Sequence, residues 1–433
     1  MLELQNVREN PELVIKGLRK RHLDQAEALV NQLLEADQNR RQTQVQLDRL
    51  KAELNTQSKN IGIFKAQKQE NEAQAAIEAT AALKAQIKEG EELLRNFEKQ
   101  VQDTLYLLPN LPHDQVPEGK NAEQNLVAYA HGDLPQLPEN ARPHWDLIRD
   151  FDIIDFEMGV KVSGAGFPFY KGAGARLQRA LISFFLDEAT KAGYLEVIPP
   201  LLVNADSGYG TGQLPDKEGQ MYFAPADDLY LIPTAEVPIT NIFRDVILEE
   251  SDFPLKRVGY TPCFRREAGS WGAEVRGLNR LHQFDKVEIV QIQHPDHSYQ
   301  ALEEMKTHVQ GLLEKLGLPY RVLKLCAGDL GFTSAFTYDL EVFSGAQKRW
   351  LEVSSVSNFE TFQANRLKLR YRAKDQKKNV LAHTLNGSAL ALPRIVAALL
   401  ENNQSLDGQS IALPSVLHAY TGFTKIEKKV KMD

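Results

Sequence analysis

Two stretches on either side of one loop, Phe264-Arg-Arg-Glu267 and Arg280-Leu-His-Gln-Phe-Asp-Lys-Val-Glu288, decide the fold that the sequence predicts. Alternate side chains of a strand point to the same face, so Arg265 and Glu267 share one face, and cations, carboxylates and the ring of Phe284 share one face of the returning strand. Such a surface suits an exposed hairpin with cross-strand ion pairs. It also suits a nucleotide, which needs a ring to stack on, a carboxylate for an exocyclic amine and an arginine for phosphate.

Around this hairpin the sequence predicts a sheet covered by helices. Short β-rich runs are mixed with helical patterns, and no strict alternation of strand and helix occurs. We therefore expect an α+β domain with a mixed or mostly antiparallel sheet. The expected strands are residues 195–203, 257–266, 280–290, 337–343 and 349–353, the expected helices are 176–192, 296–316 and 393–402, and a polar connection is expected at 121–143.

The amino-terminal part of the chain carries two heptad registers. Apolar and small side chains recur at steps of three and four over residues 26–61 and again over 76–108, with a polar break at 62–71. This pattern predicts an antiparallel helical hairpin, a coiled-coil arm about 50 Å long at about 1.5 Å per residue. The arm is expected to occupy residues 1–110 and to be followed by a second domain at 111–433.

Composition limits the possible functions. The formal net charge of −7 would argue against a nucleic-acid partner if it were evenly spread, but residues 40–68 hold seven basic side chains against two acidic ones. That segment is either a solvated coiled-coil surface or a phosphate-binding stripe. The 2 cysteines cannot build a four-ligand zinc site, and the chain shows no signal peptide or membrane span. We expect a cytoplasmic protein without zinc or membrane contact.

Two further patterns suggest phosphate and metal chemistry. Small residues that follow Asn386 run into a helix beginning at Pro393, which puts Arg394 in the first turn. A cation there opposes the helix dipole, so either an anion lies nearby or a structural salt bridge holds the arginine. Glu352 and Ser355 suit Mg²⁺ as oxygen ligands, or they are ordinary strand polarity. No G-x-x-x-x-G-K-[ST] loop occurs, so any nucleotide would bind without one.

Three stretches resemble the motifs of the class II aminoacyl-tRNA synthetases. Motif 1 matches about residues 176–200, ending in Gly193-Tyr-Leu-Glu-Val-Ile-Pro-Pro200, motif 2 matches about 257–290, and motif 3 matches about 384–402. Within that class the chain resembles the seryl-tRNA synthetases of the bacterial type over nearly its whole length. Further stretches fit that family in order: Thr211-Gly-Gln-Leu-Pro215, Thr234-Ala-Glu236, Arg276-Gly-Leu, Gly328-Asp-Leu-Gly-Phe, Tyr338-Asp-Leu-Glu-Val and Asn386-Gly-Ser388.

The resemblance implies a role for each site residue. Arg265 would bind the α-phosphate of ATP and the serine carboxylate, and Arg394, with Arg280, would hold the γ-phosphate. Glu267 would bind the adenine amine while Phe284 stacks on the ring. The implied catalytic residues are Arg265 and Arg394. The implied ATP site comprises Arg265, Arg266, Glu267, Arg280, Leu281, Phe284, Glu352, Val353, Ser354, Ser355 and Arg394, with Mg²⁺ on Glu352 and Ser355. The implied serine site comprises Thr234, Ala235, Glu236, Arg265, Glu288, Asn386 and Ser388.

The same resemblance implies the reaction and the partners. L-serine would be activated with ATP to seryl-adenylate, and the seryl group would pass to the 3′ end of tRNA(Ser), and of tRNA(Sec) where present. The chain would form a homodimer through motif 1, with Pro200 at the interface. The arm would bind tRNA through Arg40, Arg41, Arg49, Lys51 and Lys59. Two alternatives stay open: a catalytically silent tRNA-binding relative, and a ligase that loads amino acids onto a carrier protein, which is expected to lack the arm.

Overall fold

The computed structural model of this chain describes residues 1–216, 218–267, 276–374 and 378–428. The chain divides into two compact units: the first comprises Met1–Arg19 and Leu23–Pro109, and the second comprises Lys20–His22 and Asn110–Asp433. Most of the expected motif 2 loop, residues 268–275, lies outside the described residues. Within the described ranges, no helix is long and apolar enough to cross a bilayer.

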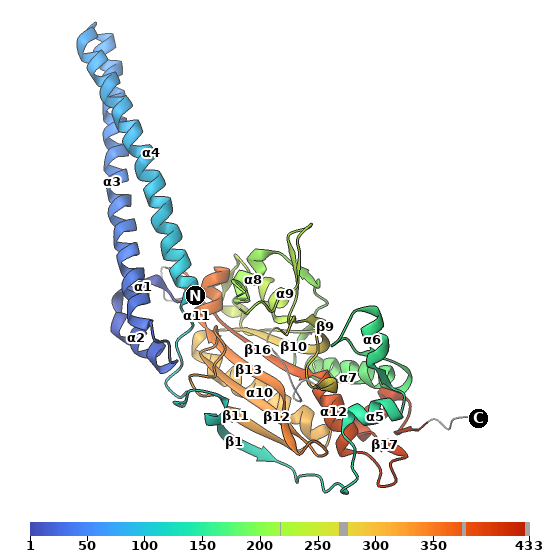
Figure 1. Cartoon of the computed structure of the whole chain (residues 1–433). Helices are drawn as coiled ribbons and strands as arrows, with labels where there is room; N and C mark the ends of the chain where they lie inside the picture. Colours follow the sequence, from blue (N-terminus) through green and yellow to red (C-terminus); the bar gives the residue numbers. More distant parts are fainter. Residues whose placement is uncertain (217, 268–275, 375–377, 429–433) are drawn as a thin grey trace. The chain divides into compact units, whose positions relative to one another are not determined.

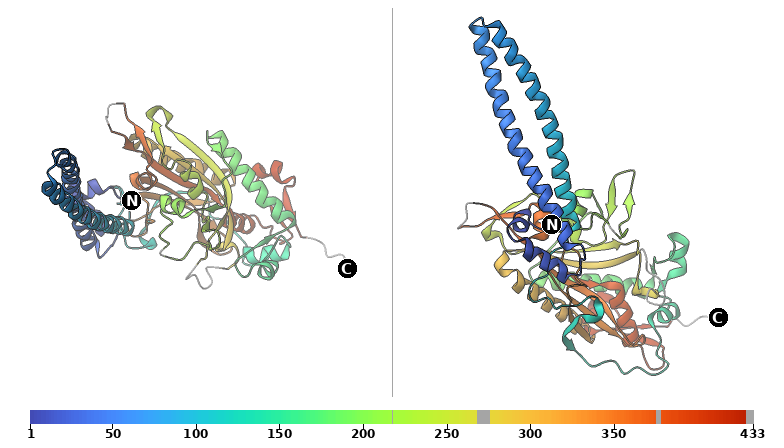
Figure 2. Two further views of the ribbon diagram at one scale, coloured as in Figure 1. Left: turned by 90° about the horizontal axis from the view of Figure 1, so that it is seen from above. Right: turned by 60° about the vertical axis from the view of Figure 1, so that its left-hand side comes forward.

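The first unit is a long antiparallel helical hairpin joined to two short helices (Figures 1 and 2). Its helices are α1 (Leu4–Glu9), α2 (Pro11–Lys20), α3 (Ala26–Ala66) and α4 (Glu70–Leu107). The predicted hairpin is confirmed, but its break is shorter than predicted. Helix α3 continues past Gly62, and only Gln67, Lys68 and Gln69 separate α3 from α4. A single glycine costs a helix only about 1 kcal/mol, which a helix of this length tolerates.

The second unit is built on one eight-stranded sheet, in the order β1-β11-β12-β13-β16-β10-β9-β4. In that order its strands are Leu126–His131, Tyr320–Lys324, Phe336–Ser344, Arg349–Glu360, His383–Ala391, Gln283–Gln293, Leu255–Phe264 and Leu195–Glu196. Neighbouring strands are antiparallel except β4 and β9, which are parallel. The predicted antiparallel sheet flanked by helices is therefore confirmed.

The longer helices of this unit, α7 (Gly172–Lys191), α10 (Ser298–Lys315) and α12 (Leu392–Asn402), pack on this sheet. Their apolar side chains share one core cluster with the sheet. Strand β10 shows how the sheet separates this core from a polar face. Val287 and Ile289 belong to the core cluster, whereas Lys286 and Glu288 line a cavity. The period of two in this strand thus places apolar and polar side chains on opposite faces.

Shorter elements complete the second unit. The remaining helices are α5 (His144–Asp150), α6 (Phe156–Val162), α8 (Ala205–Thr211), α9 (Glu236–Asn241), α11 (Thr361–Leu367) and α13 (His418–Thr421). The remaining strands are β2 (Ile154–Asp155), β3 (Phe169–Tyr170), β5 (Leu202–Val203), β6 (Phe223–Ala224), β7 (Leu229–Leu231), β8 (Ile247–Glu249), β14 (Arg370–Arg372), β15 (Val380–Leu381), β17 (Ser410–Ala412) and β18 (Lys425–Glu427).

Several predicted elements differ from the structure, among them the strand expected at 349–353, which continues to Glu360 as β13. The expected polar connection at 121–143 contains β1, a sheet edge whose six residues are all exposed, so it lacks the alternation that reveals a half-buried strand. The expected strand at 195–203 is split into β4 and β5, because Pro199 and Pro200 cannot donate ladder hydrogen bonds. The expected hairpin strands are shorter at the loop: β9 ends at Phe264 and β10 begins at Gln283.

Candidate active site

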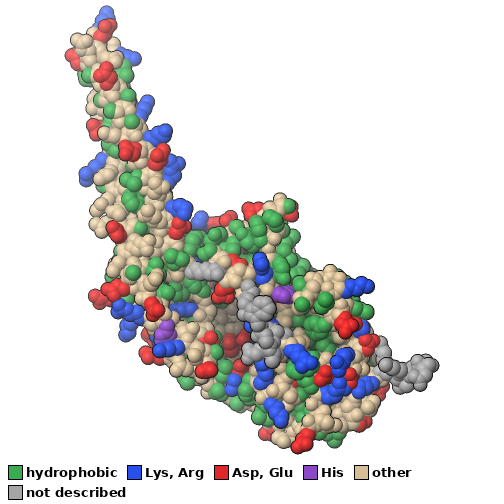
Figure 3. Space-filling model, in the orientation of Figure 1, with side chains coloured by type: hydrophobic (Ala, Val, Ile, Leu, Met, Phe, Trp, Pro, Cys, Tyr) green, Lys and Arg blue, Asp and Glu red, His purple; other side chains and the backbone are tan. Residues whose placement is uncertain are grey.

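A cavity of about 680 Å³ lies on the polar face of the sheet. This volume falls within the roughly 300–1,000 Å³ of small-molecule sites. Figure 3 shows a hollow in the second unit with acidic side chains visible inside it. Predicted site residues that line the cavity are Arg265, Glu267, Arg280, Leu281, Phe284, Glu352, Val353, Ser354, Ser355 and Arg394 from the ATP set, and Thr234, Glu236, Glu288, Asn386 and Ser388 from the serine set.

Three residues predicted for the second unit do not line the cavity. Ala235 is fully buried in an apolar cluster that packs around α9 and α11. Arg266 donates its main-chain N–H to the carbonyl oxygen of Gln220 (2.8 Å) and does not line the cavity. Pro200 is exposed between β4 and β5. The functional roles expected for these residues stay predictions.

The carboxylate of Glu288 forms the centre of one polar group in the cavity. Its Oε1 accepts from Asn386 Nδ2 (3.0 Å), and its Oε2 accepts from the Ser388 hydroxyl (3.3 Å) and pairs with Lys286 Nζ (2.8 Å). The antiparallel pairing of β10 with β16 sets Glu288 directly opposite Ser388, which explains how residues distant in sequence meet. Lys286 shares a strand face with Glu288, and that alternation could have added it to the predicted site.

A second carboxylate, Glu236, lies in the same polar group. Glu236 is buried, and Gln363 Nε2 donates to its Oε1 (2.7 Å) while Thr384 Oγ1 donates to Gln363 Oε1 (2.7 Å). Burial, followed by the charge of Glu288, raises the pKa of Glu236 to about 7. The carboxylates of Glu236 and Glu288 lie near the ammonium of Lys286 and the guanidinium of Arg265, and their oxygens can accept hydrogen bonds from a cationic ligand group.

Arginine side chains form a second polar group. The guanidinium of Arg265 lies 5.2 Å from the centre of the Phe284 ring, and its Nε donates to the carbonyl oxygen of Pro233 (3.3 Å). Glu267 and Arg280 form an ion pair beyond the ends of β9 and β10. The predicted hairpin thus gathers a ring, two cations and a carboxylate at one cavity, although Arg265, Glu267 and Arg280 lie outside the strands rather than on them.

Arg394 also belongs to this second group and lies in the first turn of α12. The helix begins at Leu392, one residue earlier than predicted. Arg394 Nη1 donates to the carbonyl oxygen of Glu352 (2.7 Å), and its Nε donates to that of Asn279 (3.1 Å). The Glu352 carboxylate lies 3.8 Å away. Neutral carbonyls therefore hold most of the guanidinium in place, and this arrangement keeps its charge available for an anionic ligand.

Acidic oxygens near Arg394 suit a divalent cation. Ser355 Oγ donates to Asp339 Oδ1 (2.6 Å), and burial followed by the charge of Glu352 raises the pKa of Asp339 well above its ordinary value. A cation would relieve this repulsion between carboxylates. Among the described residues, no group of three or more His, Cys, Asp or Glu side chains could hold a metal by itself. Magnesium commonly completes its shell with water and substrate phosphates, so this donor set fits it.

Basic residues of the arm occupy several environments within the first unit. Arg40 pairs with the buried carboxylate of Asp37 (2.8 Å), and Lys51 pairs with Glu91 (2.8 Å). Arg41 and Arg49 line a shallow groove that also contains Arg8 and Asp37, and Lys59 is exposed. On the visible face of the arm, basic side chains are interspersed with acidic ones (Figure 3). The role of these residues in tRNA binding stays a prediction.

Comparison with family models matches both units. The model of the tRNA synthetase class II core domain (G, H, P, S and T) matches residues 223–403. The model of the seryl-tRNA synthetase N-terminal domain matches residues 1–112. The two matches together cover more than half of the chain.

Full-length relatives agree with the family models. The chain is 51% identical to the serine–tRNA ligase of Salinibacter ruber over 98% of this chain and 99% of that protein. It is 46% identical to the serine–tRNA ligase of Prosthecochloris aestuarii over 99% of each chain. Among solved structures, the seryl-tRNA synthetase of Pyrococcus horikoshii complexed with ATP matches with a TM-score of 0.91 and 34% identity, covering 99% of this chain and 100% of that one.

Proposed function

The chain belongs to the class II seryl-tRNA synthetases, and on this basis we propose that it attaches L-serine to tRNA(Ser), and to tRNA(Sec) where present, using ATP. The observation that carries the proposal is one cavity lined by two distinct polar groups. The carboxylates of Glu236 and Glu288 suit the ammonium and hydroxyl of serine. The guanidinium groups of Arg265 and Arg394 suit the phosphates of ATP.

The serine part of the proposal rests on the contacts around Glu288. Asn386 and Ser388 orient its carboxylate, and Glu236 supplies a second acceptor nearby. Arg265 would pair with the serine carboxylate. A site built to hydrogen-bond a hydroxyl leaves buried polar groups unpaired when alanine enters, whereas rejection of threonine depends on one methyl group. Threonine is therefore the harder competitor.

The activation step needs cations more than a general base. A serine carboxylate is ionised at pH 7, and the obstacle to its attack on the α-phosphorus of ATP is repulsion between anions. Arg265 would neutralise charge at the α-phosphate, and Arg394 with Arg280 would hold the γ-phosphate. The adenine would stack near Phe284, with its amine directed to Glu267. Seryl-adenylate and pyrophosphate would be the products.

Magnesium would bind at Glu352 and Ser355. The neighbouring Asp339, whose pKa is raised first by burial and then by the charge of Glu352, would ionise more readily beside a bound cation and add a second oxygen donor. When bound, the ion would supply positive charge to the phosphates of ATP. The chain's own residues would orient it: Glu352 and Ser355 belong to the same strand, β13, which also carries the main-chain acceptor for Arg394.

Two surfaces support the partners that we propose. Leu195, Ile198, Leu201 and Leu202 surround Pro200 and are exposed, with Ile198 at 90% of its full area. An apolar surface of this kind favours a homodimer through motif 1. The arm, with Arg40, Arg41, Arg49, Lys51 and Lys59, would bind tRNA(Ser), and a cytoplasmic location is expected for a chain with this role. The arm also argues against the carrier-protein ligase.

The test is amino-acid-dependent exchange of pyrophosphate into ATP with serine, threonine, alanine and glycine in parallel. Serine is expected to give the fastest exchange, and charging of tRNA(Ser) is expected to follow. Exchange with none of the four amino acids would favour the catalytically silent relative. Exchange without any charging of tRNA, but with loading of a carrier protein, would favour the second alternative.

A further inference from the structure

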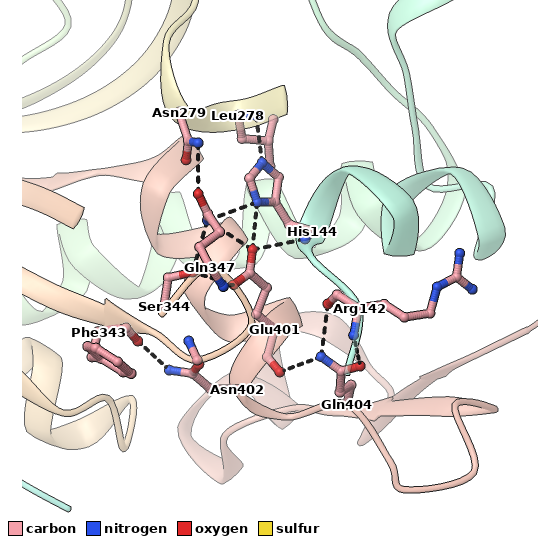
Figure 4. Close-up of polar contacts among 11 residues, drawn as sticks. Arg142, His144, Leu278, Asn279, Phe343, Ser344, Gln347, Glu401, Asn402 and Gln404 are labelled. Atoms are coloured by element: carbon pink, nitrogen blue, oxygen red, sulfur yellow. Dashed lines mark hydrogen bonds and ion pairs between the residues drawn. The ribbon is translucent and has the colours of Figure 1, made fainter. Parts of the chain in front are cut away.

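A buried histidine–glutamate pair lies behind the cavity, among residues that the sequence did not single out. His144 begins α5, and Glu401 lies in the last turn of α12, 257 residues later. Both side chains have 0% exposure, and His144 Nδ1 lies 2.7 Å from Glu401 Oε1. Figure 4 shows that this pair forms the centre of a network of polar contacts. Neither residue lines the cavity.

The hydrogen bonds fix the tautomer of His144. Its Nε2 lies 2.9 Å from the main-chain nitrogen of Leu278, which can only donate, so Nε2 must accept. The ring proton therefore sits on Nδ1 and is donated to Glu401 (2.7 Å). Gln347 Nε2 also lies 3.3 Å from Nδ1, but it can only donate and finds its acceptors in Ser344 Oγ and Glu401 Oε1. Burial acts to raise the pKa of Glu401, but hydrogen bonds from His144 and Ser344 outweigh it, and the resulting pKa lies below the ordinary value. An ionised Glu401 thus holds His144 in the tautomer that Leu278 requires.

The network reaches the cavity by a second route through Gln347. Gln347 Nε2 donates to Glu401 Oε1 (3.0 Å), and Gln347 Oε1 accepts from Asn279 Nδ2 (2.9 Å). The carbonyl oxygen of Asn279 in turn accepts from Arg394 Nε (3.1 Å). Both Leu278 and Asn279 line the cavity. The network therefore holds the segment that carries one of the acceptors for Arg394.

The fit around this segment is tight. Gly277 has a φ of +66°, and a Cβ atom there would lie 2.4 Å from His144 Nε2. Glycine at this position lets the backbone approach the imidazole closely enough for the next residue to donate its N–H. The hydrogen bond between Leu278 and His144 therefore depends on the glycine at position 277 as well as on the imidazole.

We propose that His144 is a positioning residue for ATP: by accepting from the Leu278 N–H, it holds residues 278–279 so that Arg394 is directed at the ATP phosphates. The proposal rests on the proposed function, since it assigns Arg394 to ATP. Positioning errors of about 1 Å can reduce a rate about 100-fold. The serine group on β10 and β16 has no hydrogen bond to this network in the described contacts, so ATP binding is expected to change without serine binding.

Two variants of His144 separate positioning from simple stability. His144→Asn keeps a donor near the position of Nδ1 for Glu401 but has no acceptor for Leu278. His144→Gln places an amide oxygen near the position of Nε2 and so keeps an acceptor for Leu278, but it loses the donor to Glu401. We expect His144→Asn to raise the KM for ATP about tenfold or more, with the KM for serine changed less than about twofold. For His144→Gln we expect a KM for ATP close to the wild-type value, even if its Tm is lower than that of His144→Asn.

Two further variants test the network without changing His144. Gln347→Met breaks another part of it, and Asn402→Ala is a control for loss of stability. Gln347→Met breaks the link to Asn279 at a half-buried position, and we expect a rise in the KM for ATP in the same direction as in His144→Asn. Asn402 lies on the same helix as Glu401, and its side chain bonds to the main chain of Phe343 and Gly345 but, in the contacts of the described residues, not to residues 278–279. Asn402→Ala removes these hydrogen bonds. It is expected to lower Tm and leave the KM for ATP unchanged.

The proposal is overturned if the KM values for ATP and serine change together, if His144→Gln is no better than His144→Asn, or if Asn402→Ala mimics them. Failure of the proposed function gives a different result: the wild-type chain itself would show no serine-dependent exchange. In that case calorimetric titration with ATP compares wild type with His144→Asn. Unchanged ATP affinity would then reject the positioning role, and about tenfold weaker binding would support it.

Discussion

Replacing Glu236 with glutamine is expected to stabilise the protein, and to do so more at pH 8 than at pH 5.5. Glu236 is buried beside Glu288, with Lys286 and Arg265 as the nearby cations and Gln363 as its hydrogen-bond donor. Burial and the like charge of Glu288 both disfavour its ionised form. A neutral glutamine of the same shape removes this penalty and keeps an oxygen to accept from Gln363.

The size of the effect follows from the pKa. The carboxyl of Glu236 ionises near 4.5 in the unfolded chain and near 7 in the folded one. The pKa of Glu236 is higher in the folded chain than in the unfolded chain. The stability that the neutral carboxyl contributes is therefore complete below pH 4.5 and is lost as the pH rises to 7. The full loss is about 3 kcal/mol at roughly 1.4 kcal/mol per pH unit. About 1.4 kcal/mol is lost by pH 5.5 and nearly all by pH 8, so the gain from Glu236→Gln should grow by about 2 kcal/mol between these pH values.

Urea unfolding of wild type and Glu236→Gln at pH 5.5 and pH 8 measures this difference. Glu91→Gln is the matched control, because Glu91 is a half-exposed glutamate whose pKa is lowered by Lys51. The control is expected to bring no gain at either pH. A gain for Glu236→Gln that is absent, or equal at both pH values, would refute the reasoning about this buried carboxylate.

Three further results are expected. Arg265→Ala should abolish pyrophosphate exchange, because the cavity loses the guanidinium next to Phe284, while tRNA binding in a filter assay should persist; surviving exchange would contradict the role of Arg265. Deletion of residues 36–100 should leave exchange intact and remove tRNA charging, since the deletion lies wholly in the first unit; normal charging would disprove the role of the arm. Threonine should compete with serine in exchange more strongly than alanine does, because a single methyl group gives weaker discrimination than an unpaired hydroxyl site; a stronger effect of alanine would argue against a serine hydroxyl contact at Glu288.

Local sequence patterns predicted much of the cavity wall. Arg265, Phe284 and Glu288 were found because strand alternation and chemical type are properties of neighbouring residues. The same alternation points to Lys286, whose importance beside Glu288 became clear only from the ion pair. The long heptad registers likewise predicted α3 and α4, since repeated spacing over many residues is a strong signal.

Other features depend on contacts that no local pattern contains. Strand β1 has no alternation because it is an exposed edge, and its pairing with β11 defines it. His144 and Glu401 each look like ordinary polar residues at the end of a helix. Only folding buries them together, and the partners of a buried polar residue decide its role.

The sequence by itself determined the helical hairpin and the antiparallel sheet with its helices, because these follow from periodicity along the chain, and it predicted the chemical types of the site residues. The tertiary structure alone decided the raised pKa of Glu236, the neutral carbonyls around Arg394 and the tautomer of His144. Each of these depends on burial and on distances between residues far apart in the chain. Such distances are set when the sheet assembles, and they are absent from any short stretch of sequence.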